Sequence, residues 1–356
     1  MVRRADRPRN GGAQPDAPAM FRIEEPLRER GQRVTSGLLE SESFKTMDAQ
    51  RSPRTRLSRR SWLKLAAALT LGGAMPAARA ADRIQRPIPK TGEAIPAVGL
   101  GTWQGFDVAG DRSETMQARE ALQTLVELGG RVIDSSPMYG SAESVSGQLA
   151  EELGVKSKLF FATKVWTSGK QAGIRQMEDS MRKLRVERLD LMQVHNLVDA
   201  GTHLATLREW KKAGRVRYVG VTHYHAGAHG ELESYINPGD IDFVQVNYSL
   251  AEPEADRRLL AAAAASRTAV IVNRPFAEGA MFGRVKGKPL PEWAKEIGCN
   301  SWAQFFLKWI LGHPGVTCVI PGTRNARHVA DNLGAASGPL PDESMRKRMA
   351  VHFASL

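Results

Sequence analysis

Four polar side chains, each at or just beyond the end of a short apolar run, have the types needed for proton transfer to oxygen. Asp134, Lys164 and His195 end three successive runs, and Tyr139 follows the first of them. A phenol can donate a proton, an ammonium can stabilise the phenolate, and a carboxylate can hold that ammonium in place. If the runs are neighbouring parallel strands, the four side chains meet at one rim. The pattern therefore predicts an acid–base site that acts on a polarised oxygen.

Alternating elements would bring these residues together. From residue 98 onwards, short β-rich runs alternate with amphipathic helical stretches. Eight such repeats predict an α/β fold, the (β/α)8 TIM barrel. The expected strands are 98–102, 131–135, 159–164, 189–195, 216–222, 242–247, 269–273 and 317–321. The expected helices are 114–128, 143–153, 173–184, 202–213, 254–265, 302–311, 326–335 and the C-terminal helix 342–353.

Three smaller features complete the predicted barrel. Residues 87–96 predict an N-terminal β-hairpin that plugs the barrel. Ser113 and Asn325 are expected to cap helix N-termini. The glycine-rich insertion 277–299 predicts a mobile loop over the rim.

A doubly wound dinucleotide-binding sheet is the competing fold. Its fingerprint, G-x-G-x-x-G, would have to follow the first strand. Gly99 and Gly101 match the first two positions, but Gln104 stands where the third glycine belongs. This departure favours the barrel.

The net charge of +12 suggests a nucleic-acid partner until its distribution is considered. Residues 1–80 hold 16 Lys and Arg against 8 Asp and Glu, whereas the rest of the chain holds 34 against 30. The excess therefore belongs to the front of the chain, and we expect no nucleic-acid partner. Cys299 and Cys318 could form one disulfide, but two unpaired, buried thiols are the favoured expectation.

The front of the chain has the order of an export signal. Residues 58–64 read Ser-Arg-Arg-Ser-Trp-Leu-Lys, and a short apolar run and Ala78-Arg79-Ala80 follow. This order of charged region, apolar region and small-x-small cleavage site resembles a twin-arginine signal. It predicts a signal peptide (58–80) before the barrel domain (81–356). Residues 1–57 are rich in Arg, Pro, Gly and Ser and have no sustained apolar period, which predicts a disordered basic extension. The true start is either Met1 or Met47. The resemblance implies the twin-arginine export machinery as a partner and a periplasmic or secreted location, with no stable membrane span.

Over residues 95–332 the chain resembles the aldo-keto reductase family. Seven stretches carry the resemblance, in order and at the right spacing. They are Gly99-Leu100-Gly101-Thr102-Trp103, Ile133-Asp134-Ser135-Ser136-Pro137-Met138-Tyr139-Gly140, Ala162-Thr163-Lys164, Gln193-Val194-His195-Asn196, Gly220-Val221-Thr222, Val244-Gln245-Val246-Asn247-Tyr248 and Val319-Ile320-Pro321-Gly322-Thr323.

The resemblance implies hydride transfer from NADPH to an aldehyde or ketone, with a catalytic tetrad of Asp134, Tyr139, Lys164 and His195. Tyr139 would be the general acid, and its ordinary pKa of about 10 makes it a weak one. Lys164 would lower that pKa, and each unit is worth about 1.4 kcal/mol. Asp134 would hold Lys164 charged, and His195 would orient the substrate oxygen.

The resemblance also implies an NADP(H) site. Gly322, Thr323 and Arg324 occupy the expected phosphate-binding position after the last strand. Many family members have Lys-Ser where this chain has Gly-Thr, so the positive charge must come from Arg324, Arg327 or His328. Asn332 matches a position near the adenine.

At the nicotinamide end, Thr222 and Gln245 match positions that hold the carboxamide, and His223 replaces the usual Asn. Asn273 stands where many members place a stacking Tyr, and it is followed by Arg274 and Phe276. Arg274 is expected to contact either the pyrophosphate or a rim carboxylate.

The substrate pocket is expected to be apolar. Its predicted lining is Trp103, Met138 and Trp166, and Phe106, Tyr224 and Phe282 also lie on rim loops. Packing in the core or in a lid is the open alternative for each of the six. His223, His225 and His229 lack a Cys or carboxylate partner, so no metal site is predicted.

Two other functions stay open: a non-catalytic NADP(H)-binding redox sensor, and a barrel hydrolase or lyase for a phosphorylated ligand. Composition leaves the oligomeric state undetermined.

Overall fold

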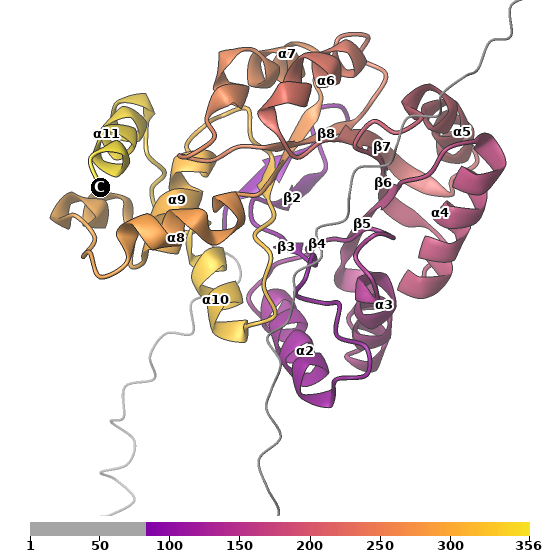
Figure 1. Cartoon of the computed structure of the whole chain (residues 1–356), viewed down its shortest axis with the longest axis horizontal. Coiled ribbons are helices and arrows are strands. Elements are labelled where there is room, and N and C mark those ends of the chain that lie inside the picture. Colours follow the sequence, from indigo (N-terminus) through magenta and orange to yellow (C-terminus); the bar gives the residue numbers. More distant parts are fainter. Residues whose placement is uncertain (1–82) are drawn as a thin grey trace, which may run out of the picture. The chain divides into compact units, whose positions relative to one another are not determined.

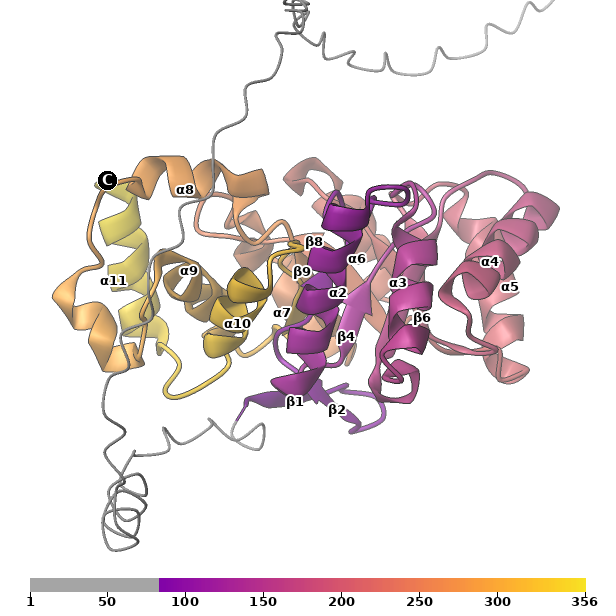
Figure 2. The same ribbon diagram turned by 90° about the horizontal axis from the view of Figure 1, so that it is seen from below.

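The computed structural model describes residues 83–356 and begins with the predicted hairpin. Strands β1 (Gln85–Pro87) and β2 (Ala94–Pro96) pair antiparallel below the barrel (Figure 2). Ile88 and Ile95 are fully buried in a cluster that includes Val132, Phe160, Phe243 and Ala269, each the first residue of a barrel strand. The hairpin therefore closes the end of the barrel at which the strands begin, as predicted.

Eight parallel strands form one sheet in the order β10-β9-β8-β7-β6-β5-β4-β3. Bridges from Val98 to Val319 and from Gly101 to Gly322 join its first and last strands, so the sheet closes on itself. A Cβ on Gly101 would lie 2.9 Å from the Ile320 carbonyl oxygen, so only glycine fits at this closure. Helices surround the sheet (Figure 1), which confirms the (β/α)8 barrel. The strands are β3 (Leu100–Gly101), β4 (Val132–Asp134), β5 (Phe160–Val165), β6 (Leu189–His195), β7 (Val216–Thr222), β8 (Phe243–Asn247), β9 (Ala269–Asn273) and β10 (Cys318–Val319).

Most of the predicted helices are present with shifts of only a few residues at their ends. Asn325 caps α10 as predicted, since its side chain accepts from the Arg327 N–H. Ser113 was the wrong cap for α2, because Asp111 accepts from the Glu114 N–H and starts the helix earlier. The helices are α2 (Arg112–Glu127), α3 (Ala142–Glu152), α4 (Lys170–Leu184), α5 (Ala200–Lys212), α6 (His229–Ile236), α7 (Leu259–Ala265), α8 (Ala280–Val285), α9 (Trp302–Leu311), α10 (Ala326–Gly334) and α11 (Glu343–Ala354).

Two stretches differ in local structure from the expectation. The predicted helix 254–265 is broken at Arg258, with a 3₁₀ turn (Glu254–Arg257) before α7. The insertion 277–299, expected as a mobile loop, contains α8 between two 3₁₀ segments, Ala277–Gly279 and Glu292–Ile297. Met281 and Val285 of α8 are buried, and this burial holds the segment against the domain.

Side chains alternate between the barrel interior and the helix layer along each strand. On β5, Phe160 and Ala162 lie inside the barrel, and Lys164 is the next residue on that face. Phe161 and Val165 face the helices. The interior is therefore apolar at the hairpin end and polar at the carboxyl ends of the strands, where the predicted tetrad lies.

No helix within residues 83–356 is both long and apolar enough to cross a bilayer. The predicted extension 1–57 and signal peptide 58–80 lie outside the described residues. These two domain assignments therefore stay predictions.

Candidate active site

Asp134 and Lys164 form a buried ion pair at the carboxyl ends of β4 and β5. Lys164 Nζ donates to Asp134 Oδ2 at 2.5 Å and to the Ser135 carbonyl oxygen at 2.6 Å. Lys164 has no exposed surface, and Asp134 is 2% exposed. Because an uncompensated charge at such depth is strongly unfavourable, the two side chains must be kept together.

Tyr139 and His195 complete the cluster. Lys164 Nζ lies 5.0 Å from the centre of the Tyr139 ring. The rings of Tyr139 and His195 meet edge to face, with centroids 6.0 Å apart. The structure thus brings the four predicted catalytic side chains together at one rim, as their strand-end positions predicted.

The ionisation of Tyr139 differs from the prediction. Burial raises the pKa of its phenol; Lys164 acts in the opposite direction, and Asp134 adds to the rise. The predicted lowering by Lys164 is present but is outweighed by burial. Burial also lowers the pKa of Lys164, but Asp134 and Tyr139 more than offset this effect, so its net pKa is raised. At neutral pH the site holds a protonated phenol beside an ammonium, which suits a proton donor.

His195 is buried and neutral. Burial, together with the charge on Lys164 and the nearby His223, lowers its pKa to about 2. Its Nδ1 lies 3.1 Å from Ser136 Oγ, so a serine hydroxyl orients the ring. A neutral imidazole with a fixed Nδ1 partner leaves Nε2 for hydrogen bonding at the rim.

Two glutamines hold the other oxygen of Asp134. Gln245 Nε2 donates to Asp134 Oδ1 at 2.8 Å, and Gln193 Nε2 donates to the same atom at 3.2 Å. Gly220 allows the strands to pack closely beside Gln193, because a Cβ there would lie 2.7 Å from the Phe243 carbonyl oxygen and 3.2 Å from Gln193 Cγ. Gln193 is not among the site residues predicted from the sequence. Its place two residues before His195 on β6 was the available signal, since alternate strand residues share a face.

The predicted nicotinamide-binding residues are joined to the tetrad through Gln245. Thr222 Oγ1 donates to Gln245 Oε1 at 3.2 Å, and Asn273 Nδ2 donates to the same oxygen at 3.4 Å and to the His223 carbonyl oxygen at 3.1 Å. Asn273 Oδ1 is buried with no hydrogen-bond partner among the described residues. A buried acceptor of this kind requires a donor, and a carboxamide N–H would supply one.

Arg274 and Phe276 lie on the loop that follows Asn273. Arg274 pairs with Glu252 at 3.1 Å and with Glu278 at 2.5 Å, so the expected rim-carboxylate contact is the one observed. Phe276 packs against Phe282, with ring centroids 4.9 Å apart. The loop therefore has an aromatic surface beside the Arg274 guanidinium, which is paired with two glutamates.

A cavity of about 370 Å³ brings five predicted cofactor residues together. Its wall also includes Asp331, whose carboxylate accepts from Ser301 Oγ at 2.7 Å and Gln304 Nε2 at 2.8 Å. These two cavity-wall residues, Ser301 and Asp331, were not predicted. The cavity has the mixed apolar and polar lining typical of nucleotide sites, so the residues present fit such a group. The lining is Phe276, Phe282, Ser301, Trp302, Ala303, Gly322, Thr323, His328, Asp331 and Asn332.

Arg324 is not among the residues that line this cavity. Its guanidinium Nη2 donates to Glu114 Oε1, and its Nε donates to Gln117 Oε1 at 3.3 Å. Both partners lie on α2. Arg324 thus follows the cavity residue Thr323 directly, but its side chain is held by the neighbouring helix.

The predicted substrate-lining residues are exposed at the rim. Trp103, Met138 and Trp166 are each more than 40% exposed, and the Trp166 ring centroid lies 6.4 Å from that of His195. Phe106 lies on the loop after β3 but is fully buried, so of the two expected roles it has core packing and not pocket lining. Exposed apolar side chains around a polar cluster can hold an apolar substrate with its polar atom at the tetrad.

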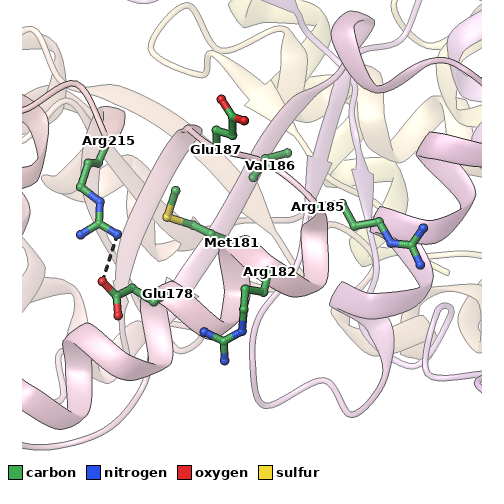
Figure 3. Close-up of a pocket in the computed structure, with 7 residues that line it drawn as sticks. All are labelled: Glu178, Met181, Arg182, Arg185, Val186, Glu187 and Arg215. Atoms are coloured by element: carbon green, nitrogen blue, oxygen red, sulfur yellow. Dashed lines mark hydrogen bonds and ion pairs between the residues drawn. The ribbon is translucent and has the colours of Figure 1, made fainter.

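A second hollow, of about 390 Å³, lies away from this rim at the C-terminal end of α4 (Figure 3). Its arginines are already paired, for example Arg215 with Glu178 at 3.1 Å and Arg182 with Asp179 at 2.7 Å. It is shallow and holds none of the predicted site residues, so it is not a candidate for the chemistry.

No group of three or more metal-ligating side chains is found within residues 83–356. Cys299 and Cys318 are free and buried, as expected. Burial raises the pKa of the Cys299 thiol to about 11, which leaves it unreactive at neutral pH.

Comparison with known proteins agrees with this geometry. The model of the aldo/keto reductase family matches residues 97–351. Methylglyoxal reductase YeaE of Escherichia coli is 30% identical over 258 residues, which cover 70% of this chain and 88% of that protein. The 9,11-endoperoxide prostaglandin H2 reductase of Trypanosoma cruzi is 30% identical over 264 residues, covering 71% and 86%.

Solved structures share the fold. An aldo-keto reductase from Klebsiella pneumoniae in complex with NADPH gives a TM-score of 0.64 at 24% identity, covering 76% of this chain and 95% of that one. A holo aldo-keto reductase from Bacillus halodurans gives 0.62 at 20% identity, covering 76% and 96%. With the family model covering the barrel and its rim, the chain belongs to the aldo/keto reductase family.

Proposed function

We propose that the protein reduces aldehydes or ketones with NADPH, and that Tyr139 is the general acid. The observation that carries this proposal is the buried Lys164–Asp134 pair beside the Tyr139 phenol. The relatives described as methylglyoxal and prostaglandin H2 reductases, and the NADPH complex of the Klebsiella protein, support it.

The cofactor would be held at two places. Thr222, Gln245 and Asn273 would bind the nicotinamide carboxamide, with the unpartnered Asn273 Oδ1 as an acceptor for its N–H. The residues that line the 370 Å³ cavity, which include Phe276 and Asn332, would bind the adenosine end of the cofactor. When bound, NADPH supplies the hydride.

The side chains of the tetrad would act on the substrate oxygen. Negative charge develops there during reduction, and Tyr139 O–H transfers its proton to that oxygen. Lys164 stabilises the resulting phenolate, and Asp134 keeps Lys164 in place through the bond at 2.5 Å. If Ser136 donates to His195 Nδ1, the ring proton is on Nε2, and His195 can donate a second hydrogen bond to the oxygen.

The direct test combines nucleotide titration with turnover. We expect NADPH to quench the intrinsic fluorescence at micromolar concentration and to be consumed with a panel of aliphatic and aromatic aldehydes. Tight NADPH binding without turnover of any carbonyl would favour the redox-sensor alternative. Absence of nicotinamide binding would favour a hydrolase or lyase and would contradict the proposal.

We also propose that the protein is exported by the twin-arginine route, on the strength of Ser58-Arg59-Arg60-Ser61-Trp62 and the Ala78-Arg79-Ala80 site. Free NADPH is expected to be scarce outside the cytoplasm, and this route generally carries folded proteins. The barrel would therefore bind its cofactor before export. Mature protein isolated from the cell envelope without bound nucleotide would count against this sequence of events.

A further inference from the structure

Arg324 lies between the nucleotide cavity and helix α2, and either could supply a partner for its guanidinium. It directly follows Thr323, which lines the nucleotide cavity, but its guanidinium donates to Glu114 and Gln117 on α2. The side chains of Arg324 and Glu114 are 34% and 37% exposed, so the ion pair lies at the surface. Gly105, just before α2, also lies against this loop, since a Cβ there would be 3.1 Å from the Thr323 carbonyl carbon.

The cavity itself offers little positive charge. None of its lining residues within the described chain is a lysine or an arginine. Its one carboxylate, Asp331, is engaged by Ser301 and Gln304, and His328 Nδ1 lies 3.4 Å from Thr323 Oγ1. A phosphate group bound here would therefore need a cation from the edge of the cavity. Arg324 and Arg327 are the two arginines next to lining residues.

We propose that Glu114 sets the preference between NADPH and NADH by competing with the 2′-phosphate for Arg324. This inference rests on the proposed function, because it assumes that the cavity binds the adenosine end of the cofactor. NADPH would have to displace Glu114 from the guanidinium, whereas NADH, which lacks the 2′-phosphate, would leave the ion pair intact. Glu114 would thus weaken NADPH binding selectively.

The relative strengths of the two contacts support such a competition. An exposed ion pair contributes up to about fivefold to an equilibrium constant. A phosphate on the planar guanidinium fork forms stronger, charge-assisted bonds. The phosphate can therefore win, but at a loss of affinity no larger than the strength of the pair that it breaks.

The test is a titration of purified protein with NADPH and with NADH, followed by fluorescence quenching so that it does not depend on turnover. Glu114→Gln should tighten NADPH binding by about three- to fivefold and leave NADH binding unchanged. Glu120→Gln, on the same helix and exposed, is the matched control and should change neither affinity.

Two arginine variants complete the cycle. Arg324→Met should weaken NADPH binding by at least tenfold, and Glu114→Gln in that background should have no further effect. Arg327→Met should leave the NADPH preference intact.

Several results would overturn the inference: weaker or unchanged NADPH binding in Glu114→Gln, an equal gain for NADH, a gain that persists without Arg324, or loss of the preference in Arg327→Met. Wild-type protein that binds neither nucleotide would overturn the proposed function, and this inference with it.

Discussion

Asp134 receives hydrogen bonds from three side chains, and this makes it the centre of the site. Lys164 donates to one of its oxygens, and Gln193 and Gln245 donate to the other. Gln193, which the sequence did not predict, therefore donates to the same oxygen as Gln245, which it did. Gln193→Leu should leave Asp134 Oδ1 with one donor and lower kcat by about tenfold through a less fixed Lys164. Single-turnover reduction checks this, and an unchanged rate would show that Gln245 alone suffices.

His195 should make the stability of the protein depend on pH. In the unfolded chain a histidine titrates near its ordinary pKa of about 6.5, whereas burial, Lys164 and His223 lower the pKa of His195 to about 2. The unfolded state therefore binds an extra proton below pH 6.5, and stability is lost as pH falls towards the folded pKa. Between pH 7 and pH 5 this histidine alone should lower the free energy of unfolding by about 2 kcal/mol.

Urea denaturation at the two pH values measures the effect. His195→Gln is the control, and it should reduce the difference between them by about that amount, whatever it does to stability at pH 7. An equal pH dependence in wild type and variant would show that His195 keeps an ordinary pKa in the folded protein.

Among the elements, the N-terminal hairpin can be tested apart from the chemistry. Ile95 of β2 is fully buried at the end of the barrel opposite the tetrad. Ile95→Ala should lower the free energy of unfolding by about 2–5 kcal/mol, because a cavity is left in the barrel floor. Turnover per folded molecule should be unchanged. Denaturation curves with an active-site titration check both statements, and a loss below 1 kcal/mol would mean that the hairpin does not plug the barrel.

The elements that could be predicted from the sequence are those with strong local signals. The bounds of β6, β7 and β9 match the expected strands 189–195, 216–222 and 269–273, because apolar β-rich runs end there at polar residues. Helix α6 (His229–Ile236) was missed because it is short and its first turn contains a histidine and a glycine.

The residues of the site also differ in whether the sequence could predict them. The tetrad could be predicted because each strand end is a fixed place on the barrel rim. The ion pair of Arg324 with Glu114 could not, because it joins residues 210 positions apart through side chains at the surface.

For the chain as a whole, the open question is where it works. The folded domain from Arg83 onwards accounts for the reductase chemistry, while the export prediction rests on residues 58–80 alone. Replacing Arg59 and Arg60 by lysine should retain the precursor in the cytoplasm, with NADPH binding unaffected. Fractionation followed by N-terminal mass spectrometry should find Ala81 at the start of the exported wild-type protein. Equal distribution of wild type and variant would contradict twin-arginine export.

The measurement that tests the central claim most directly is the turnover of Tyr139→Phe. The variant removes only the phenolic oxygen beside the Lys164–Asp134 pair, so it should bind NADPH as wild type does. Its kcat for aldehyde reduction should fall by about 10²- to 10⁴-fold, because the general acid is lost. If Tyr139→Phe consumed NADPH and formed alcohol as fast as the wild-type protein does, the account would be contradicted.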